Sequence, residues 1–168
     1  MKNRVLLIAS FPGSLVAFRG HLVRDLLSAG FEVHVAAPGL NNEPSVRSFL
    51  RSLGVQLHDV PLSRTGTNPL ADLAFLFRLY MLQVAVRPEV ALSYTVKPVV
   101  YGTLAAWLAR VPRRFALITG LGYAFTGARR SILAGLVQGL YRIALARADK
   151  VFFQNPDDQS RFREVGIL

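Results

Sequence analysis

The residues best suited to chemistry in this sequence follow the ends of short apolar runs. The segment Tyr94-Thr95-Val96-Lys97-Pro98 places a lysine directly before a proline, and that proline indicates the first turn of a helix. A cation at the positive end of a helix dipole is unfavourable unless an anion occupies the same space. Lys97 therefore predicts a phosphate-bearing ligand, with an exposed loop lysine as the alternative interpretation.

Glycines after two other apolar runs permit close approach of the backbone to a ligand. Ser10-Phe11-Pro12-Gly13-Ser14 follows the first run, and Thr119-Gly120-Leu121-Gly122 follows a later one. Glycine admits positive φ and has no side chain to block a ligand, although a tight turn explains both segments equally well. Arg129 and Arg130 come shortly afterwards and suit a diphosphate or an anionic lipid, or else form a solvated pair.

Acid–base chemistry has one candidate, His21, which lies about one turn into a predicted helix near the same loops. His21 could act as a general base, or it could simply pair on the helix surface with Asp25, four residues on. His34 and His58 lie within predicted strands and are interpreted as structural. The sequence has no cysteine, and its three histidines lack metal-ligand spacing, so we expect no metal and no cofactor.

Composition limits the class of protein. The chain has 168 residues, of which 52% are hydrophobic and 18% charged, and this favours one folded domain over residues 1–168. Lys and Arg number 20 against 10 Asp and Glu, giving a net charge of +10 that comes mostly from arginine. Arginine suits phosphates, carboxylates and anionic headgroups. No basic helix, RNP motif or aromatic platform accompanies the charge, so we expect no nucleic-acid partner.

Several further classes lack their sequence signatures. The chain has neither a G-x-G-x-x-G fingerprint nor a P-loop, which disfavours classical NAD or ATP binding. No secretory signal is present at the start. The apolar stretches 70–86 and 131–146 are interrupted by Asp72 and Arg78 and by Arg142, whereas a spanning helix needs roughly 18 uninterrupted apolar residues. We expect a cytoplasmic chain that is peripheral to a membrane.

These candidates need a scaffold, and the apolar periodicity predicts one of alternating strands and helices. Six strands are predicted at 4–9, 31–36, 55–58, 89–93, 114–118 and 150–153, with helices at 18–29, 44–53, 70–86, 98–110, 131–148 and 156–165. This alternation predicts an α/β fold, a Rossmann-like doubly wound parallel sheet in the order 3-2-1-4-5-6, with 2-1-3-4-5 as the alternative. Ligands bind at the carboxyl edge of such sheets, formed here by loops 10–17, 37–43, 59–68, 94–97, 119–130 and 154–155.

Four motifs in this order resemble the amino-terminal half of bacterial family 4 glycosyltransferases. They are Ser14-Leu15-Val16-Ala17-Phe18-Arg19, Tyr94-Thr95-Val96-Lys97-Pro98 with Tyr101-Gly102, Ile118-Thr119-Gly120-Leu121-Gly122 and Val151-Phe152-Phe153-Gln154-Asn155. The members most similar extend undecaprenyl-diphosphate-linked sugars in O-antigen, capsule or glycan assembly. The resemblance implies a GT-B architecture of two Rossmann-like domains, with no metal and with retention at the transferred sugar. It implies substrate binding by Gly13, Ser14, Arg19, Tyr94, Thr95, Lys97, Thr119, Gly120, Leu121, Gly122, Arg129, Arg130 and Asn155.

The implied partners are a nucleotide-sugar donor (a UDP-sugar), a polyprenyl-diphosphate-linked saccharide acceptor and an anionic membrane surface. The chain departs from the full family pattern because it has no Glu-x7-Glu pair, a feature of the donor-binding domain. We therefore expect that the donor-binding carboxy-terminal domain is absent from this chain and that the chain alone is inactive. The alternatives are an inverting GT-B enzyme with His21 as base, or a non-catalytic membrane-recruiting subunit.

Two helices of this chain could contact the membrane. Stretches 70–86 and 131–148 mix large apolar residues with arginine, and such helices can lie on an anionic bilayer. The alternative is that most of their apolar residues belong to the core against the sheet. We expect the protein at the inner face of the cytoplasmic membrane.

Overall fold

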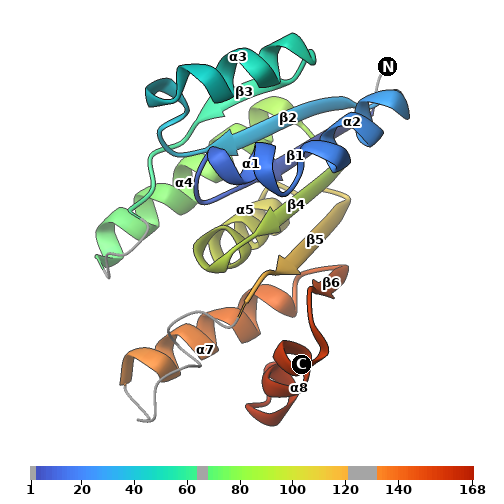
Figure 1. Cartoon of the computed structure of the whole chain (residues 1–168). Coiled ribbons are helices and arrows are strands. Elements are labelled where there is room, and N and C mark those ends of the chain that lie inside the picture. The colour runs from blue at the N-terminus through green and yellow to red at the C-terminus, as the bar shows by residue number, and fades with distance from the viewer. Residues whose placement is uncertain (1–2, 64–67, 121–131) are drawn as a thin grey trace.

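A single parallel sheet organises the chain (Figure 1). The computed structural model describes residues 3–63, 68–120 and 132–168. Its strands are β1 (Arg4–Ile8), β2 (Glu32–Ala37), β3 (Gln56–Asp59), β4 (Val90–Tyr94), β5 (Arg113–Ile118) and β6 (Lys150–Phe153). All five pairings are parallel and the order is β3-β2-β1-β4-β5-β6. This confirms the Rossmann-like fold and the predicted strand order.

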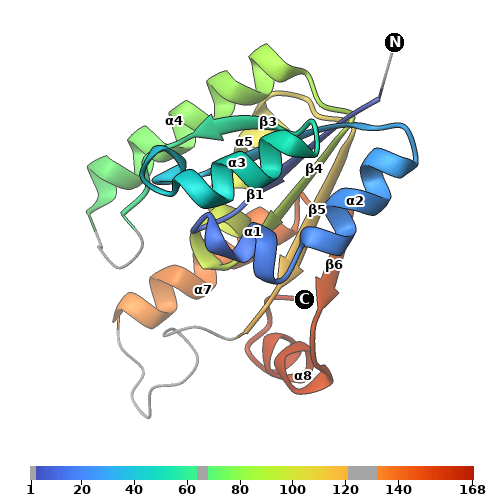
Figure 2. The same ribbon diagram turned by 45° about the horizontal axis from the view of Figure 1, so that its top comes forward.

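Helices cover both faces of the sheet, as a doubly wound fold requires (Figure 2). One face carries α1 (Gly13–Ala17), α2 (Gly20–Ser28) and α3 (Pro44–Ser52). The other carries α4 (Pro69–Val86), the π-helix η2 (Pro98–Gly102), α5 (Thr103–Leu108) and α7 (Ile132–Leu145). A 3-10 turn, η1 (Leu40–Asn42), precedes α3, and α8 (Pro156–Glu164) follows β6.

The alternation of side chains along β1 explains the two layers. Leu7 packs with the α1–α3 side of the core, whereas Leu6 and Ile8 face Phe75 and Leu79 of α4. All of these side chains are almost fully buried. A strand buried on both faces has a continuous run of apolar residues in its sequence, and this run predicts β1.

Two predicted segments differ from the structure. Residues 10–17, expected as a loop, contain the short helix α1, and the helix predicted over 18–29 begins only at Gly20. Pro12 is already in the right-handed helical region with φ −65°, so α1 begins directly after it. Residues 98–110, expected as one α-helix, start as the π-helix η2 before continuing as α5.

The π-helix η2 lies unusually close to β4 at Gly102. A Cβ atom built on Gly102 would stand 2.5 Å from Ser93 Oγ and 3.1 Å from Ile8 Cδ1. The backbone of Gly102 is ordinary helix, with φ −68°. Space, and not backbone conformation, is therefore what requires glycine here. Gln83 of α4 donates a buried hydrogen bond of 3.3 Å to the Gly102 carbonyl, which links α4 to the same point.

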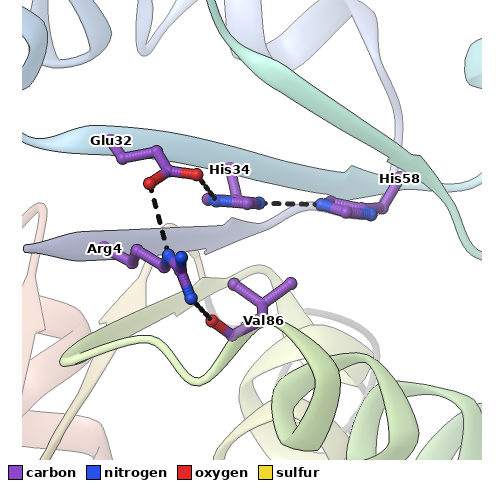
Figure 3. Close-up of polar contacts among 5 residues, drawn as sticks. All are labelled: Arg4, Glu32, His34, His58 and Val86. Atoms are coloured by element: carbon purple, nitrogen blue, oxygen red, sulfur yellow. Dashed lines mark hydrogen bonds and ion pairs between the residues drawn. The ribbon is translucent and has the colours of Figure 1, made fainter. Parts of the chain in front are cut away.

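A chain of polar side chains crosses the sheet from β1 to β3 (Figure 3). Arg4 bonds the Val86 carbonyl at the end of α4 at 2.9 Å and pairs with Glu32 at 3.2 Å. His34 Nε2 lies 3.0 Å from Glu32 and His34 Nδ1 lies 2.9 Å from His58 Nε2, and the planes of the two imidazole rings differ by only 10°. Hydrogen bonds from His34 and Arg4 lower the pKa of Glu32. The two histidines connect strands, as their interpretation as structural residues anticipated.

Folding stability is expected to fall on mild acidification because of His58. Burial, and then the neighbouring charge of His34, lower the pKa of His58 below its usual 6.5. The unfolded chain therefore binds a proton before the folded chain does, and this part of the stability is lost as pH falls below 6.5. Urea unfolding at several pH values between about 7.5 and 5.5 should show the free energy of unfolding decrease. His58→Gln should make this decrease smaller, whereas His21→Gln should leave it unchanged. If the free energy of unfolding fell equally with pH in the wild-type protein and both variants, His58 would not be the cause.

Candidate functional site

The candidate residues gather at the carboxyl edge of the sheet. Strands β4 and β5 pair in parallel, with Tyr94 opposite Leu117, so the segments that follow them leave the sheet side by side. Lys97 follows the first strand, and Thr119 and Gly120 follow the second. The expected clustering of these segments at one edge is confirmed, and Gly120 has a φ of +150° that favours glycine.

Tyr94 forms the centre of a polar cluster at the point where the strand order reverses between β1 and β4. Ser14 of α1 donates a hydrogen bond of 2.7 Å to the Phe11 carbonyl, so its oxygen is left to accept from the Tyr94 hydroxyl, 3.1 Å away. The guanidinium of Arg19 lies 4.9 Å from the centre of the Tyr94 ring, a cation–π distance. Burial raises the pKa of Tyr94 to about 12, so its hydroxyl remains a donor at neutral pH.

Two polar atoms beside this cluster are buried without a hydrogen-bond partner. They are Nε of Arg19 and Oγ1 of Thr95. Thr95 also has a φ of +71°, a conformation that costs a non-glycine residue about 1–3 kcal/mol. Unpaired buried donors and backbone strain concentrate where a protein binds ligands. These features make the switch point between β1 and β4 the candidate binding site.

Lys97 has an anion within the protein, so its position does not by itself require a phosphate-bearing ligand. Its Nζ lies 2.6 Å from Oδ1 of Asp72 in the first turn of α4, and the two side chains are only 16% and 14% exposed. Tyr101 donates a hydrogen bond of 3.1 Å to the other oxygen of Asp72. Burial and the carboxylate of Asp72 raise the pKa of Tyr101 to about 12. The helix-dipole argument was sound, but the anion that satisfies it comes from α4.

A cavity of about 360 Å³ opens beside this ion pair. Its walls come from three elements: α4, the segment from Val96 through η2, and α7. The walls are largely apolar: α4 contributes Leu73 and Leu76, the segment through η2 contributes Val96 and Val100, and α7 contributes Leu136, Val137 and Leu140. Asp72, Lys97 and Tyr101 supply its polar side chains. The cavity thus joins the carboxyl edge of the sheet to the outer surface of α4 and α7.

That outer surface is strongly apolar. Large exposed apolar side chains lie on the three α-helices of this side: Leu70, Leu73, Phe77, Met81 and Val84 on α4, Trp107 and Leu108 on α5, and Leu136 and Ile143 on α7. We call these nine residues the apolar face. By length and composition α4 could cross a bilayer, but its Phe75 and Leu79 are core residues against the sheet. Residues 70–86 thus place core residues against the sheet on one side and exposed apolar residues on the other.

A family comparison decides the identity of the scaffold. The family described as the glycosyl transferase 4-like domain matches residues 15–167. The chain belongs to this family.

One curated relative is similar in sequence to this chain, and several solved structures share its fold. An N,N'-diacetylbacillosaminyl-diphospho-undecaprenol alpha-1,3-N-acetylgalactosaminyltransferase of Campylobacter jejuni is 26% identical over 98% of this chain and 43% of its own length. Among solved structures, a UDP-N-acetylglucosamine 2-epimerase matches with a TM-score of 0.68 at 15% identity, covering 99% of this chain and 46% of the other. Acinetobacter baumannii MurG matches with a TM-score of 0.62 at 14% identity, over 93% and 42%. The chain thus spans less than half the length of these proteins.

Other predicted site residues of this glycosyl transferase 4-like chain have different surroundings. Gly13 is the first residue of α1, and His21 is exposed on α2 with no hydrogen bond to any described side chain, Asp25 included. Asn155 caps α8: its Oδ1 accepts from the Asp158 amide at 2.8 Å, as its position before a proline predicted. Leu121, Gly122, Arg129 and Arg130 lie outside the described residues. Within the described ranges, no three His, Asp or Glu side chains gather as metal ligands would.

Sequence analysis missed two residues of this edge, Asp72 and Tyr101. Asp72 was noted only as an interruption of an apolar stretch, and Tyr101 only as part of a motif. An isolated acid in the first turn of an otherwise apolar helix was the available signal, because burying a carboxylate is costly without a partner. What the sequence could not supply was the pairing of Asp72 with Lys97 across 25 residues of chain.

Proposed function

We propose that this chain is the amino-terminal, acceptor-binding half of a retaining glycosyltransferase. The enzyme transfers a sugar from a nucleotide-sugar, a UDP-sugar, to a polyprenyl-diphosphate-linked saccharide. A second Rossmann-like domain supplies most of the donor site, and residues 1–168 alone are inactive. Family membership supports the reaction class, and the name of the Campylobacter jejuni relative, which specifies a diphospho-undecaprenol-linked sugar, supports the acceptor class.

The observation that carries this proposal is the juxtaposition of a polar edge and an apolar face. Arg19 and Thr95 leave buried polar atoms unpaired at the carboxyl edge, where the diphosphate and sugar of an acceptor need hydrogen-bond donors and cations. The apolar face begins beside the same edge, at Leu70 and Leu73 of α4. A lipid-linked saccharide has these two chemistries in one molecule.

The defining experiment is a transfer assay of the full-length protein. A panel of UDP-sugars is offered together with a short polyprenyl-diphosphate-linked saccharide, and product is separated by chromatography. We expect transfer with retention of anomeric configuration, readable by NMR of the product. Absence of transfer from every UDP-sugar, or transfer only to water, would contradict the proposal. A protein that binds vesicles and a separate donor-binding chain, but transfers nothing, would be a membrane-recruiting subunit instead.

His21→Ala in the full-length protein is expected to change kcat/KM by less than about tenfold. Loss of a general base would reduce kcat/KM by about 10²–10⁴-fold, so the two cases are easily distinguished. His21 is exposed and lacks a carboxylate to orient it. The same transfer assay measures the effect, with His21→Gln as the matched variant. A loss of several orders of magnitude in both would favour the inverting mechanism with His21 as base.

Membrane attachment is the second part of the proposal. We place the protein at the inner face of the cytoplasmic membrane, with the apolar face against the lipid. Arginines border this face: Arg78 on α4 and Arg110 after α5 are exposed, and the Arg147 guanidinium lies 4.5 Å from the Trp107 ring centre. Tryptophan and arginine at the rim of an apolar surface suit the interface of an anionic bilayer, where each arginine adds about 1 kcal/mol.

Phe77→Asp should weaken binding of the full-length protein to anionic vesicles by at least about tenfold, because burying a Phe side chain is worth about 1.5–3 kcal/mol. Phe77 is 61% exposed on α4. The matched control is Phe18→Asp, since Phe18 is 68% exposed but follows α1 on the other side of the sheet. Vesicle co-sedimentation measures both. Equal losses for the two variants would contradict this orientation.

A further inference from the structure

The cavity between α4, η2 and α7 has few polar side chains, and those it has are paired with one another. Of its described polar side chains, Asp72 accepts from both Lys97 and Tyr101, so its two oxygens are occupied within the protein. The remaining lining is aliphatic or proline. A saccharide in such a cavity would lose more hydrogen bonds to water than these few side chains could replace, which is unfavourable. An apolar ligand suffers no such loss.

The walls are also unusual for a surface exposed to water. Leu73 and Leu136 line the cavity from opposite sides and are 61% and 60% exposed. Both belong to the apolar face, so the cavity is a recess in that face and does not form a separate site. Its volume of about 360 Å³ is in the range of small-molecule sites.

Position relates the recess to the polar edge. Lys97 comes shortly after the end of β4 at Tyr94, and Asp72 lies in the first turn of α4. The recess therefore opens at the carboxyl edge of the sheet. Lys97 is two residues from Thr95, whose Oγ1 is buried and unpaired. A molecule with a diphosphate at this edge and an apolar chain attached to it would meet both surfaces at once.

We propose that this recess binds the first isoprene units of the polyprenyl carrier, adjacent to its diphosphate. The inference rests on the proposed function for the identity of the carrier. It assigns the protein a direct part in selecting the lipid: the chain nearest the diphosphate leaves the bilayer and packs between Leu73 of α4 and Val137 of α7. Recognition then depends on the chain as well as on the saccharide.

Calorimetric titration of the full-length protein with farnesyl diphosphate and isopentenyl diphosphate tests this without any transfer reaction. Each buried methylene is worth about fourfold in affinity, so farnesyl diphosphate should bind at least about tenfold more tightly. Val137→Phe, which fills the recess, should remove most of that preference and leave isopentenyl diphosphate binding unchanged. Leu136→Trp makes the same test at an exposed lining position, where folding is not at risk. Ile143→Phe is the matched control on α7, because Ile143 is 56% exposed and does not line the recess.

The outcomes of these experiments distinguish the proposed lipid recess from its alternatives. A farnesyl preference lost in Val137→Phe and Leu136→Trp but kept in Ile143→Phe supports the proposal. Equal affinities for the two diphosphates in the wild-type protein, or an unchanged preference in both recess variants, overturn it. Laurate binding as tightly as farnesyl diphosphate would also overturn it, since the recess would then be a general acyl-chain site. Failure of the transfer assay with every UDP-sugar, together with an intact farnesyl preference, would count against the proposed function alone.

Discussion

Gly102→Val is expected to lower the free energy of unfolding by about 4 kcal/mol, and Gly102→Ala by about 2 kcal/mol, because overpacking a closed interior typically costs about 1–3 kcal/mol and occasionally more. The first added carbon would lie 2.5 Å from Ser93 Oγ, closer than any ordinary contact, and Ser93 is itself buried in β4. Two further methyl groups would have to enter the same interface between η2 and the sheet. Urea unfolding of the 168-residue chain measures the loss as a lower midpoint at constant slope.

The chain contains its own controls for this effect. Gly135 and Gly139 lie in the helix α7 with nothing within 4 Å of an added Cβ. Alanine at either position should stabilise the protein slightly, by up to about 1 kcal/mol, because glycine is a poor helix former. In the Gly102→Ala protein, a second change Ser93→Ala removes the oxygen that the new methyl group meets and should recover much of the loss. A loss that is identical with and without Ser93→Ala would show that close packing is not the reason for Gly102.

Gly102 also shows how far sequence reasoning reaches in this protein. The strands and their order follow from apolar runs separated by capped helices, and both are local or topological rules. Asn68 and Asn155 before prolines marked the starts of α4 and α8, and the structure confirms both caps. No local rule distinguishes Gly102, whose φ is ordinary, from a glycine that tolerates alanine. Its requirement arises only where η2 meets β4.

The candidate site divides in the same way. Topology alone places Tyr94, Lys97 and Gly120 at one edge, because Tyr94 ends β4 and the other two follow the neighbouring strands β4 and β5. The partners of these residues come from elsewhere in the chain: Ser14 from α1 for Tyr94, and Asp72 from α4 for Lys97. Pairings over 80 and 25 residues depend on how helices pack on the sheet, which periodicity does not specify. Lys97 does lie beside an anion, as the electrostatic argument predicted, but that anion is the carboxylate of Asp72, which the sequence did not identify.

Lys97→Met is expected to reduce kcat/KM of the full-length enzyme by about 100-fold, because a hydrogen bond from a charged group is worth about 1.5–3 kcal/mol. Methionine keeps the apolar stem of lysine and removes only the ammonium, so the recess beside it is not enlarged. The same variant should also lose stability, since the Asp72 carboxylate is then left 14% exposed beside the Tyr101 hydroxyl. Two effects of one substitution therefore have to be separated.

A double-mutant cycle with Asp72→Asn separates them. If Lys97 served only to neutralise Asp72, the double variant would regain both stability and activity, because neither charge would then be buried without a partner. If Lys97 also contacts the diphosphate of the acceptor, the double variant should regain stability in urea unfolding but remain about 100-fold less active. The loss should then appear as a higher KM for the acceptor, with the donor KM unchanged. Recovery of full activity in the double variant would remove Lys97 from the binding site and leave it a structural partner of α4.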